Sequence, residues 1–308
     1  MKVVSNISTR LQQLGGVTLL ILMVPPLCWA GNFIVGRAVR DDIPPLTLAV
    51  CRWLIASLIL LPFAWRAMRK DAGLYCQQKW LILATSITGI TGFNSLVYLG
   101  LQTTVATNGI ILNSFIPLLI ALFGALFFGL SLKLTQIAGM LVSFAGVLAI
   151  VTQGDPQVLL QLAFAKGDLI IFTAMICWAL YTIWLKQLPA QMDRTALITL
   201  QMILGLLFLL PFWGWEMASV DLPELSHSAL LAVAYVGIFP SVIAYLCYGA
   251  CVARLGPARA GMSIHLMPVF GAVLSVLLLG ETFHGYHLAG ILMIFSGIAL
   301  ANRTGQQA

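Results

Sequence analysis

Two prolines lie near the centres of long apolar segments that the sequence predicts to be membrane-spanning helices. Pro117 and Pro268 each remove a backbone hydrogen bond and bend the helix, which leaves a carbonyl one turn earlier without its partner. Polar side chains stand one turn before them, at Asn113, Ser114 and His265. In transporters built from inverted repeats, paired interruptions of this kind point to a substrate site near the bilayer midplane. The alternative is a kink that only shapes helix packing.

His265 is the only titratable side chain that we expect near the middle of the membrane. Ionisable residues at that depth default to a functional role, and an imidazole titrates near neutral pH. We therefore expect His265 to contact a cavity, with proton coupling as a further role. The alternative is a neutral ring that is hydrogen-bonded to a backbone carbonyl.

Aromatic and amide side chains recur on particular helix faces. Asn94 and Tyr98 are one turn apart, and Ser241, Tyr245 and Tyr248 follow the same helical spacing. A cavity with apolar walls and a few polar groups would suit an amphipathic or aromatic substrate. Helix packing and interfacial aromatic belts are the alternative use of these rings. The expected cavity residues are Trp29, Asn32, Asn94, Tyr98, Asn113, Ser114, Trp178, Tyr181, Tyr245, Tyr248 and His265, with helix kinks at Pro117 and Pro268.

Arg52 lies roughly two turns below the outer end of its apolar segment. Its long side chain is expected to snorkel to the outer surface, where Asp41 and Asp42 are available as partners. That is a structural role, and an outer gate or an anion contact is the alternative.

Signatures of other chemistries are missing from the sequence. It contains no GxxxxGK[ST] motif for an ATP motor and no HExxH or Ser/His/Asp arrangement for hydrolysis. The single run Glu281-x-x-His284-x-x-His287 is better explained as a capped helix start than as a metal site. No acid lies within the first three apolar segments, so weakly coupled or facilitated transport is expected. We expect no enzyme activity, no cofactor and no metal.

The composition excludes water as the main solvent of this chain. Of its 308 residues, 60% are hydrophobic and 8% are charged, and the mean hydropathy is +0.99, whereas ordinary soluble domains carry about 25% charged residues. The net charge is +6, and the charged residues lie between the apolar runs. This placement indicates contact with a membrane surface and no binding of nucleic acid. The six cysteines form no CxxC pair and are expected to be packing residues.

Ten apolar windows are long enough to cross a bilayer, since a spanning helix needs about 20 residues. The expected fold class is therefore an all-α membrane protein with ten transmembrane helices. The weakest breaks lie at 102–106 and 131–133. The expected spans are 16–36, 45–65, 80–100, 104–129, 134–152, 167–186, 195–215, 228–250, 257–279 and 284–302.

The two halves of the chain repeat each other. Cys-Trp-Ala at 28–30 returns at 177–179, and Leu-Leu-Pro-Phe at 60–63 returns at 209–212, both at an offset of 149. The first match also argues against reading 1–30 as a cleaved leader. Later matches, at an offset of 151, pair Pro117 with Pro268, Gly129 with Gly280, Gly139 with Gly290 and Gly146 with Gly297. The predicted repeats are 1–153 and 154–308.

Five spans per repeat is an odd number, so the second copy must enter the membrane from the opposite side. The small residues at 139, 146, 290 and 297 are two turns apart, which predicts close packing between the last helices of the two repeats. With both termini in the cytoplasm, twelve of the sixteen Lys and Arg residues face inward, as the positive-inside rule requires. Eight of the ten acids, among them Glu216, then face outward.

Several of these residues resemble the EamA-type branch of the drug/metabolite transporter superfamily. They are Trp29-Ala30-x-Asn32-Phe33 with Arg37, Pro44-Pro45 with Arg52, and Gly280-Glu281. The resemblance covers nearly the whole chain and implies two inverted five-helix repeats, no hydrolysed cofactor, and export of small metabolites such as amino acids or of drugs. Gly129-Leu130 replaces a second Gly-Glu, and Tyr181 stands where Asn32 would repeat, so the two halves are chemically unequal.

The predicted function is a secondary transporter that exports small metabolites, amino acids or related compounds, across the cell inner membrane by alternating access. Efflux of lipophilic or cationic drugs is the alternative. The expected partners are a small-molecule substrate and the lipid bilayer, and the sequence is compatible with a monomer.

Overall fold

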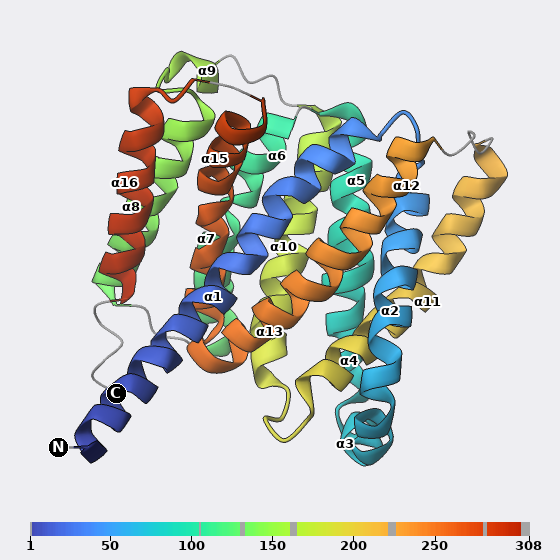
Figure 1. The fold of residues 1–308 in the computed structure, drawn as a ribbon. Coiled ribbons are helices and arrows are strands. Elements are labelled where there is room, and N and C mark those ends of the chain that lie inside the picture. The colour runs from blue at the N-terminus through green and yellow to red at the C-terminus, as the bar shows by residue number, and fades with distance from the viewer. Residues whose placement is uncertain are drawn as a thin grey trace.

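The chain folds into a bundle of long helices, shown in Figure 1. The structure, a computed structural model, describes residues 2–104, 106–129, 133–160, 165–220, 226–279 and 282–302. All regular structure in these ranges is helical, without a strand. An apolar chain must satisfy its own backbone hydrogen bonds inside a membrane, and helices do so within one segment.

The first half of the chain contains α1 (Lys2–Ala38), α2 (Pro45–Lys70), α3 (Ala72–Gln77), α4 (Lys79–Ser86), the π-helical segment η1 (Ile87–Gly92), α5 (Phe93–Thr103), α6 (Ala106–Asn113), α7 (Ile116–Phe128) and α8 (Leu134–Val151). The second half contains α9 (Gln157–Leu160), α10 (Lys166–Gln187), α11 (Arg194–Ser219), α12 (His227–Val236), the π-helical segment η2 (Gly237–Ile243), α13 (Ala244–Leu255), α14 (Pro257–Met262), the 3₁₀ segment η3 (Ser263–Leu266), α15 (Met267–Leu279) and α16 (Gly285–Asn302).

Local sequence explains several helix boundaries. Pro45 occupies the first turn of α2, where its missing N–H is not needed. The side chains of Asp193 and Ser226 accept backbone hydrogen bonds at the starts of α11 and α12. Gly129 ends α7 at a positive φ of 63°, a conformation that glycine adopts without steric cost.

Eight stretches of the described residues are long and apolar enough to cross a membrane. They are Gly16–Gly36, Pro45–Lys70, Lys79–Thr103, Asn108–Phe128, Leu134–Val151, Lys166–Gln187, Arg194–Ser219 and His227–Leu255. The sequence predicts ten, and the last two are shorter than expected. The expected span 257–279 is divided by η3 just before Pro268, and the apolar part of α16 is only Gly285–Ala301. The uncertain break at 102–106 is real, because Thr104 is extended and ends α5.

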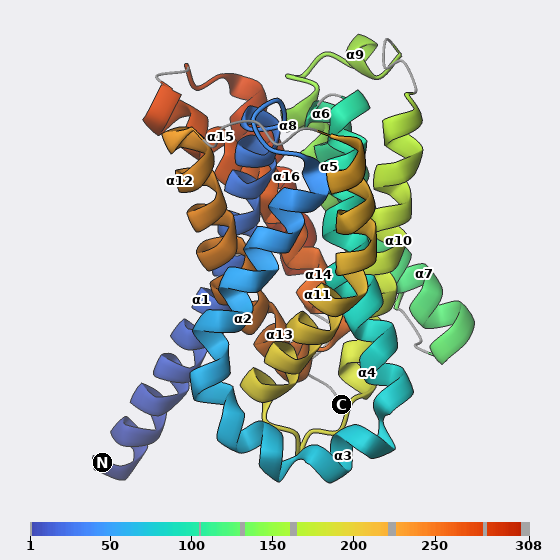
Figure 2. The ribbon, with the colours of Figure 1, turned by 90° about the vertical axis from the view of Figure 1, so that its right-hand side faces the viewer.

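The helices of the two halves pack in matching pairs. Contacts join α2 to α11 and α8 to α16, and the contact of α5 with α10 is mirrored by that of α13 with α1. The contact of α7 with α10 is likewise mirrored by that of α15 with α1. Figure 2 shows α2 and α11 side by side. Matching helices also run in opposite directions, because α1 rises from the lower end of Figure 1 while α10 descends from the upper end.

Carboxylates hold both ends of the α2–α11 pair. The Glu216 carboxylate, on α11, accepts hydrogen bonds from the backbone N–H groups of Leu46 and Thr47 at 2.9 and 2.8 Å. These are the free donors at the start of α2, where a negative charge is favoured. At the other end, Asp71 accepts from the backbone N–H of Asp193 at 2.8 Å. Glu216 is therefore buried in a helix contact at its end of the bundle.

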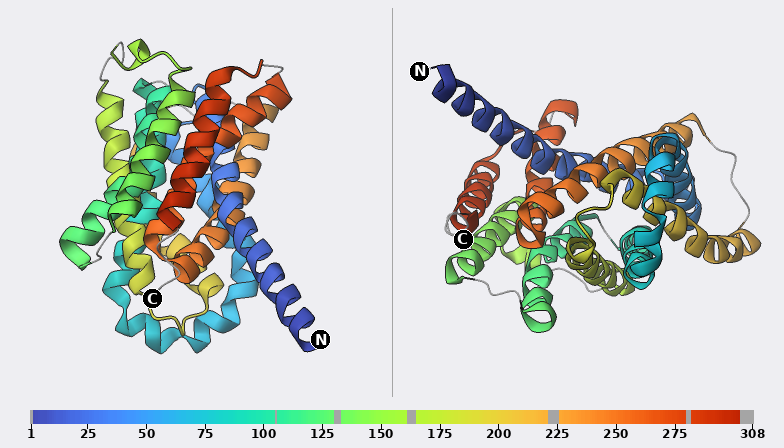
Figure 3. Two further views of the ribbon diagram at one scale, coloured as in Figure 1. Left: turned by 90° about the vertical axis from the view of Figure 1, so that its left-hand side faces the viewer. Right: turned by 90° about the horizontal axis from the view of Figure 1, so that it is seen from below.

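Glycines allow α8 and α16 to touch along one edge of the bundle (Figure 1 and Figure 3). A methyl group on Gly139 would lie 2.5 Å from the carbonyl oxygen of Gly297, and one on Gly146 would lie 2.7 Å from that of Gly290. Real Cβ atoms do not approach backbone so closely. The predicted close packing between the last helices of the two halves is confirmed.

We predict that Gly139→Ala destabilises the protein. The added methyl group meets backbone, which cannot move aside as a side chain can, and overpacking of this kind costs about 1–3 kcal/mol. The melting temperature of the detergent-purified protein should fall. Gly214→Ala is the matched control, because a methyl group on Gly214 meets nothing within 4 Å. Equal melting temperatures for Gly139→Ala and the wild type would contradict the contact.

Candidate functional site

Two π-helical segments stand at matching places in the two halves. The segment η1 interrupts the third apolar stretch, and η2 interrupts the eighth. Single π turns inside α-helices are rare. Where they do occur, they are often found at functional sites. Pro240 lies within η2. The ring of Tyr181 packs against η1 at Gly89, where a side chain on residue 89 would collide with it. Neither segment was expected from the sequence, although Pro240 is a visible signal for η2.

The π segments present backbone carbonyls to side chains at the centre of the bundle. The hydroxyl of Tyr245 donates to the Gly89 carbonyl at 2.7 Å. The indole N–H of Trp29 donates to the Pro240 carbonyl at 3.1 Å. The hydroxyl of Ser241, within η2, donates to the carbonyl of Val236, the last residue of α12, at 2.6 Å. Irregular backbone at membrane depth is tolerated where protein groups satisfy it, and these bonds do so.

The guanidinium group of Arg52 lies among these groups. Its side chain is fully buried on the inner face of α2. Nε donates to the hydroxyl of Ser241 at 2.8 Å, and Nη1 is 2.7 Å from both Asn94 Oδ1 and Tyr98 OH. Nη1 is also 3.4 Å from Asn32 Oδ1, which accepts a 2.9 Å bond from Tyr98. All of these partners are neutral.

The expectation that Arg52 snorkels to the outer surface is wrong. Its guanidinium points into the bundle, and Asp41 instead pairs with the neighbouring Arg40 at 3.3 Å. The physical reason is the rotation of α2, which places Arg52 on the same buried face as Ala49 and Ala56. Arg52, like His265, is therefore a fully buried ionisable side chain.

An aromatic cluster surrounds this polar group. The ring of Trp178 has its centroid 5.0 Å from that of Trp29, 5.1 Å from that of Tyr181 and 5.4 Å from that of Tyr245. Tyr248 completes the cluster at 5.2 Å from Trp178. Most of these rings meet edge to face or tilted, which is the preferred geometry for aromatic pairs. All five belong to the expected cavity residues, so the structure brings them together.

A narrow cavity of about 10 Å³ opens at the edge of the cluster. It lies between both halves of the chain and is lined by Trp29, Asn32, Phe33, Phe93, Asn94, Asn113, Ile116, Trp178, Ile264 and Met267. Five of these were expected from the sequence. Phe93 was not, although its ring is 4.5 Å from that of Trp178. In this conformation the centre of the bundle is closed, with room for about one water molecule.

His265 and Ser114 lie away from the narrow cavity. Nε2 of His265 is 2.9 Å from the Ser114 carbonyl oxygen, and Nδ1 is 2.7 Å from the Ser143 hydroxyl on α8. Because a carbonyl can only accept, Nε2 carries a proton, and in a neutral ring Nδ1 accepts from Ser143. The Ser114 hydroxyl donates to the Ile111 carbonyl. These contacts join η3 to α8 and to the break between α6 and α7. His265 is therefore better described by the alternative, a neutral ring that is hydrogen-bonded to a backbone carbonyl, than by contact with a cavity.

The expected helix interruptions at Pro117 and Pro268 are present. Pro117 lies in the first turn of α7, after α6 ends at Asn113. Pro268 follows the 3₁₀ segment η3 as the second residue of α15. Asn113 donates to the sulfur of Met267 at 3.1 Å, which joins the two interruptions.

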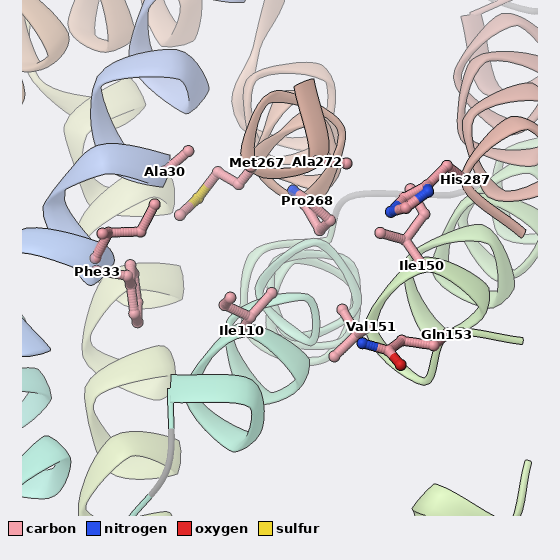
Figure 4. Close-up of a pocket in the computed structure, with 12 residues that line it drawn as sticks. Ala30, Phe33, Ile110, Ile150, Val151, Gln153, Met267, Pro268, Ala272 and His287 are labelled. Atoms are coloured by element: carbon pink, nitrogen blue, oxygen red, sulfur yellow. The ribbon is translucent and has the colours of Figure 1, made fainter. Parts of the chain in front are cut away.

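Two larger cavities lie toward opposite ends of the bundle. The upper cavity, of about 280 Å³, is drawn in Figure 4. It is lined by Ala30, Phe33, Ile34, Ile110, Ile150, Val151, Gln153, Met267, Pro268, Gly271, Ala272 and His287. The lower cavity, of about 270 Å³, is lined by Thr18, Leu22, Met23, Leu255, Arg259, Ser263, Leu266, Phe295 and Ile298. Phe33 and Met267 line both the upper and the narrow cavity, so they form the wall between them.

A few expected features lie outside the described residues. They are Gly280-Glu281, together with Asp221, Glu224, Leu130, Ser131 and Arg303. Arg37 lies in α1, but its side chain is also outside the description.

Long apolar helices that enclose a cluster of polar side chains indicate a multi-pass membrane protein. The chain belongs to the EamA-like transporter family, whose model matches residues 16–152 and again residues 165–303. The resemblance seen in the sequence is therefore confirmed.

Relatives named as transporters match most of the chain, and a solved structure shares its fold. The chain is 28% identical to the uncharacterized transporter YetK of Bacillus subtilis, over 87% of this chain and 81% of that protein. It is 25% identical to a probable amino-acid metabolite efflux pump of Salmonella typhimurium, over 92% of this chain and 93% of that protein. A crystal structure at 21% identity has the same fold, with a TM-score of 0.73 over 92% of this chain and 96% of that one.

We predict that His265→Ala lowers stability without changing substrate preference. Loss of the ring leaves the Ser114 carbonyl and the Ser143 hydroxyl buried without their partner, which costs about 1–3 kcal/mol. Ser143→Ala is the matched variant, and the double variant should lose less than the sum of the two, because they share one bond. Additive losses in melting temperature, or a changed substrate range in His265→Ala, would contradict this assignment.

Proposed function

We propose that this chain is a secondary transporter that exports small metabolites, amino acids or related compounds, across the inner membrane. The observation that carries the proposal is the narrow central cavity, which is lined by both halves and shares Phe33 and Met267 with the larger upper cavity. Opening one end while the other stays closed would expose the same central site to each side in turn. That is alternating access between repeats.

The proposal includes ten membrane crossings. The segment Pro257–Leu279 and the helix α16 would add two crossings to the eight long apolar stretches. Matching helices that run in opposite directions support an inverted repeat, as five crossings in each half require. The charge bias of the loops supports cytoplasmic N- and C-termini.

This orientation predicts from which side of the membrane a reagent can reach the ends of α10 and α11. In a cysteine-free background, a membrane-impermeant maleimide added to the periplasm should label Ser219→Cys, at the end of α11, and not Gln187→Cys, at the end of α10. Both positions are exposed. The reverse labelling pattern would contradict the orientation, and labelling of both from one side would contradict the alternation of the helices.

The Salmonella typhimurium relative is described as a probable amino-acid metabolite efflux pump, which supports amino acids as the substrate class. Efflux of lipophilic or cationic drugs is the second candidate, and the aromatic cluster favours it, because such rings bind apolar or cationic groups. The two candidates differ in the charge that the central site must accept.

We predict counterflow of amino acids in proteoliposomes that contain the purified protein. Labelled amino acids, nucleosides and cationic dyes would be compared, each with and without a pH gradient. Amino acids should exchange without a gradient, since no described acid lies near the central cavity to carry a proton. Empty liposomes are the control. Transport of the dyes alone would favour the drug-efflux candidate, and transport of none would contradict the proposed function.

A further inference from the structure

Arg52 is a buried positive charge without a negative partner. Within the described part of the chain, the one ion pair is that of Arg40 with Asp41. The carboxylates of Asp71, Asp168 and Glu216 are bound by other groups at the ends of helices. An isolated buried charge is costly unless it is paired, so the network around Arg52 needs an explanation.

The hydrogen bonds around the guanidinium leave one of its nitrogens without an acceptor among the residues that the structure describes. Nε and Nη1 have acceptors on Ser241, Asn94 and Tyr98. Nη2, which carries two hydrogens, has no acceptor among the described protein groups and is fully buried. The rings of Trp53 and Tyr98 lie 4.7 and 5.8 Å from Cζ and offset only part of the charge.

The fold does not require a charge at this place. The offset of 149 that relates the first helices of the two halves pairs Arg52 with Gln201. Gln201 is equally buried, on α11, and its amide donates to the hydroxyl of Thr85 at 2.6 Å. A neutral amide therefore fills the matching position of the second half, which argues that the charge on Arg52 serves a purpose other than packing.

We propose that Arg52 binds the carboxylate of the transported molecule through Nη2, so that the substrate class is an amphipathic carboxylate such as an α-amino acid. The proposal rests on the transport function proposed above. Arginine donors suit a carboxylate, and a charged hydrogen bond in a site without water is stronger than a neutral one. The same positive charge disfavours a cationic substrate.

The cavities near Arg52 offer a binding position for the substrate and a route to it. Asn32 and Asn94, which accept from Nη1, also line the narrow cavity, so the guanidinium lies directly behind these two amides, and a carboxylate in the cavity would reach it when they move aside. Its apolar part would meet the rings of Trp29 and Trp178. The upper cavity lies behind Phe33 and Met267, and movement of those side chains would join the two cavities.

The first test uses the wild-type protein and changes only the ligand. L-phenylalanine should raise the melting temperature of the purified protein and should exchange in proteoliposomes. Phenylalaninamide and 2-phenylethylamine, which lack the carboxylate, should do so at least about tenfold more weakly, as loss of a charged hydrogen bond implies. Equal effects of all three would overturn the carboxylate role but leave transport established. Protection by chloride alone would identify an inorganic anion site and would also overturn it.

The second test places a carboxylate inside the protein. Asn94→Asp puts an anionic oxygen where Oδ1 now lies 2.7 Å from Nη1, so it competes with the substrate for the guanidinium. The variant should stay folded, and its apparent KM for L-phenylalanine should rise at least about tenfold, with less effect on phenylalaninamide. Asn94→Leu is the matched control, because it removes the hydrogen bonds of the Asn94 side chain without adding charge.

The outcomes of this second test separate binding from structure. A larger loss of L-phenylalanine transport in Asn94→Asp than in Asn94→Leu, at equal membrane abundance, supports the proposal. Equal losses in both variants, or equal losses for the carboxylate and the amide, would overturn it and show that the network is only structural. Arg52→Lys gives a further check, since it keeps the charge and loses the planar donors, and unchanged L-phenylalanine binding in it would also overturn the proposal.

Discussion

The burial of one guanidinium group constrains the centre of this bundle. A charged side chain inside a membrane protein must find acceptors from the protein, because lipid supplies none. Arg52 finds them on α1, α5 and η2, so three membrane helices must hold fixed rotations relative to α2. The aromatic rings then pack against the outer side of those acceptors, and the narrow cavity forms where the rings and amides meet.

The irregular backbone segments serve the same centre. The carbonyl of Gly89 in η1 receives the hydroxyl of Tyr245, and Tyr245 also accepts from the Asn94 amide at 3.0 Å. The segment η2 carries Ser241, the acceptor for Nε of Arg52. Each half therefore contributes one π-helical segment to a single hydrogen-bond network. The two halves share a fold but not a chemistry, because Arg52 is matched by Gln201 and Asn32 by Tyr181.

Much of this arrangement follows from the sequence alone. Apolar windows locate the helices, a nearly constant offset of 149 to 151 reveals the repeat, and Pro117 with Pro268 marks the interrupted helices. Helical spacing also groups the aromatic residues correctly, since residues one turn apart share a face. The rotation of each helix about its axis does not follow, because it depends on contacts between distant segments. That is why Arg52 was expected to face the outer surface and His265 to face the cavity.

Helix length and backbone type are the other limits. A hydropathy window counts apolar residues across η3 as though the helix were continuous, and so overestimates the uninterrupted length of 257–279. The π segments carry no distinct apolar pattern, since one extra residue per turn changes the register without changing composition. The positions of the π segments are recognised only in the structure, where side chains donate hydrogen bonds to the carbonyls of Gly89 and Pro240.

The most direct measurement is the distance between the arginine guanidinium and a bound carboxylate. Solid-state NMR on the full-length protein in lipid, with ¹⁵N-labelled arginine and L-phenylalanine labelled with ¹³C at the carboxylate, would detect their dipolar coupling. We expect a nitrogen-to-carbon separation of about 3–4 Å, as an N–H···O⁻ bond requires, and loss of the coupling in Arg52→Lys. Bound L-phenylalanine that shows no such coupling, or the same coupling in Arg52→Lys, would contradict the account.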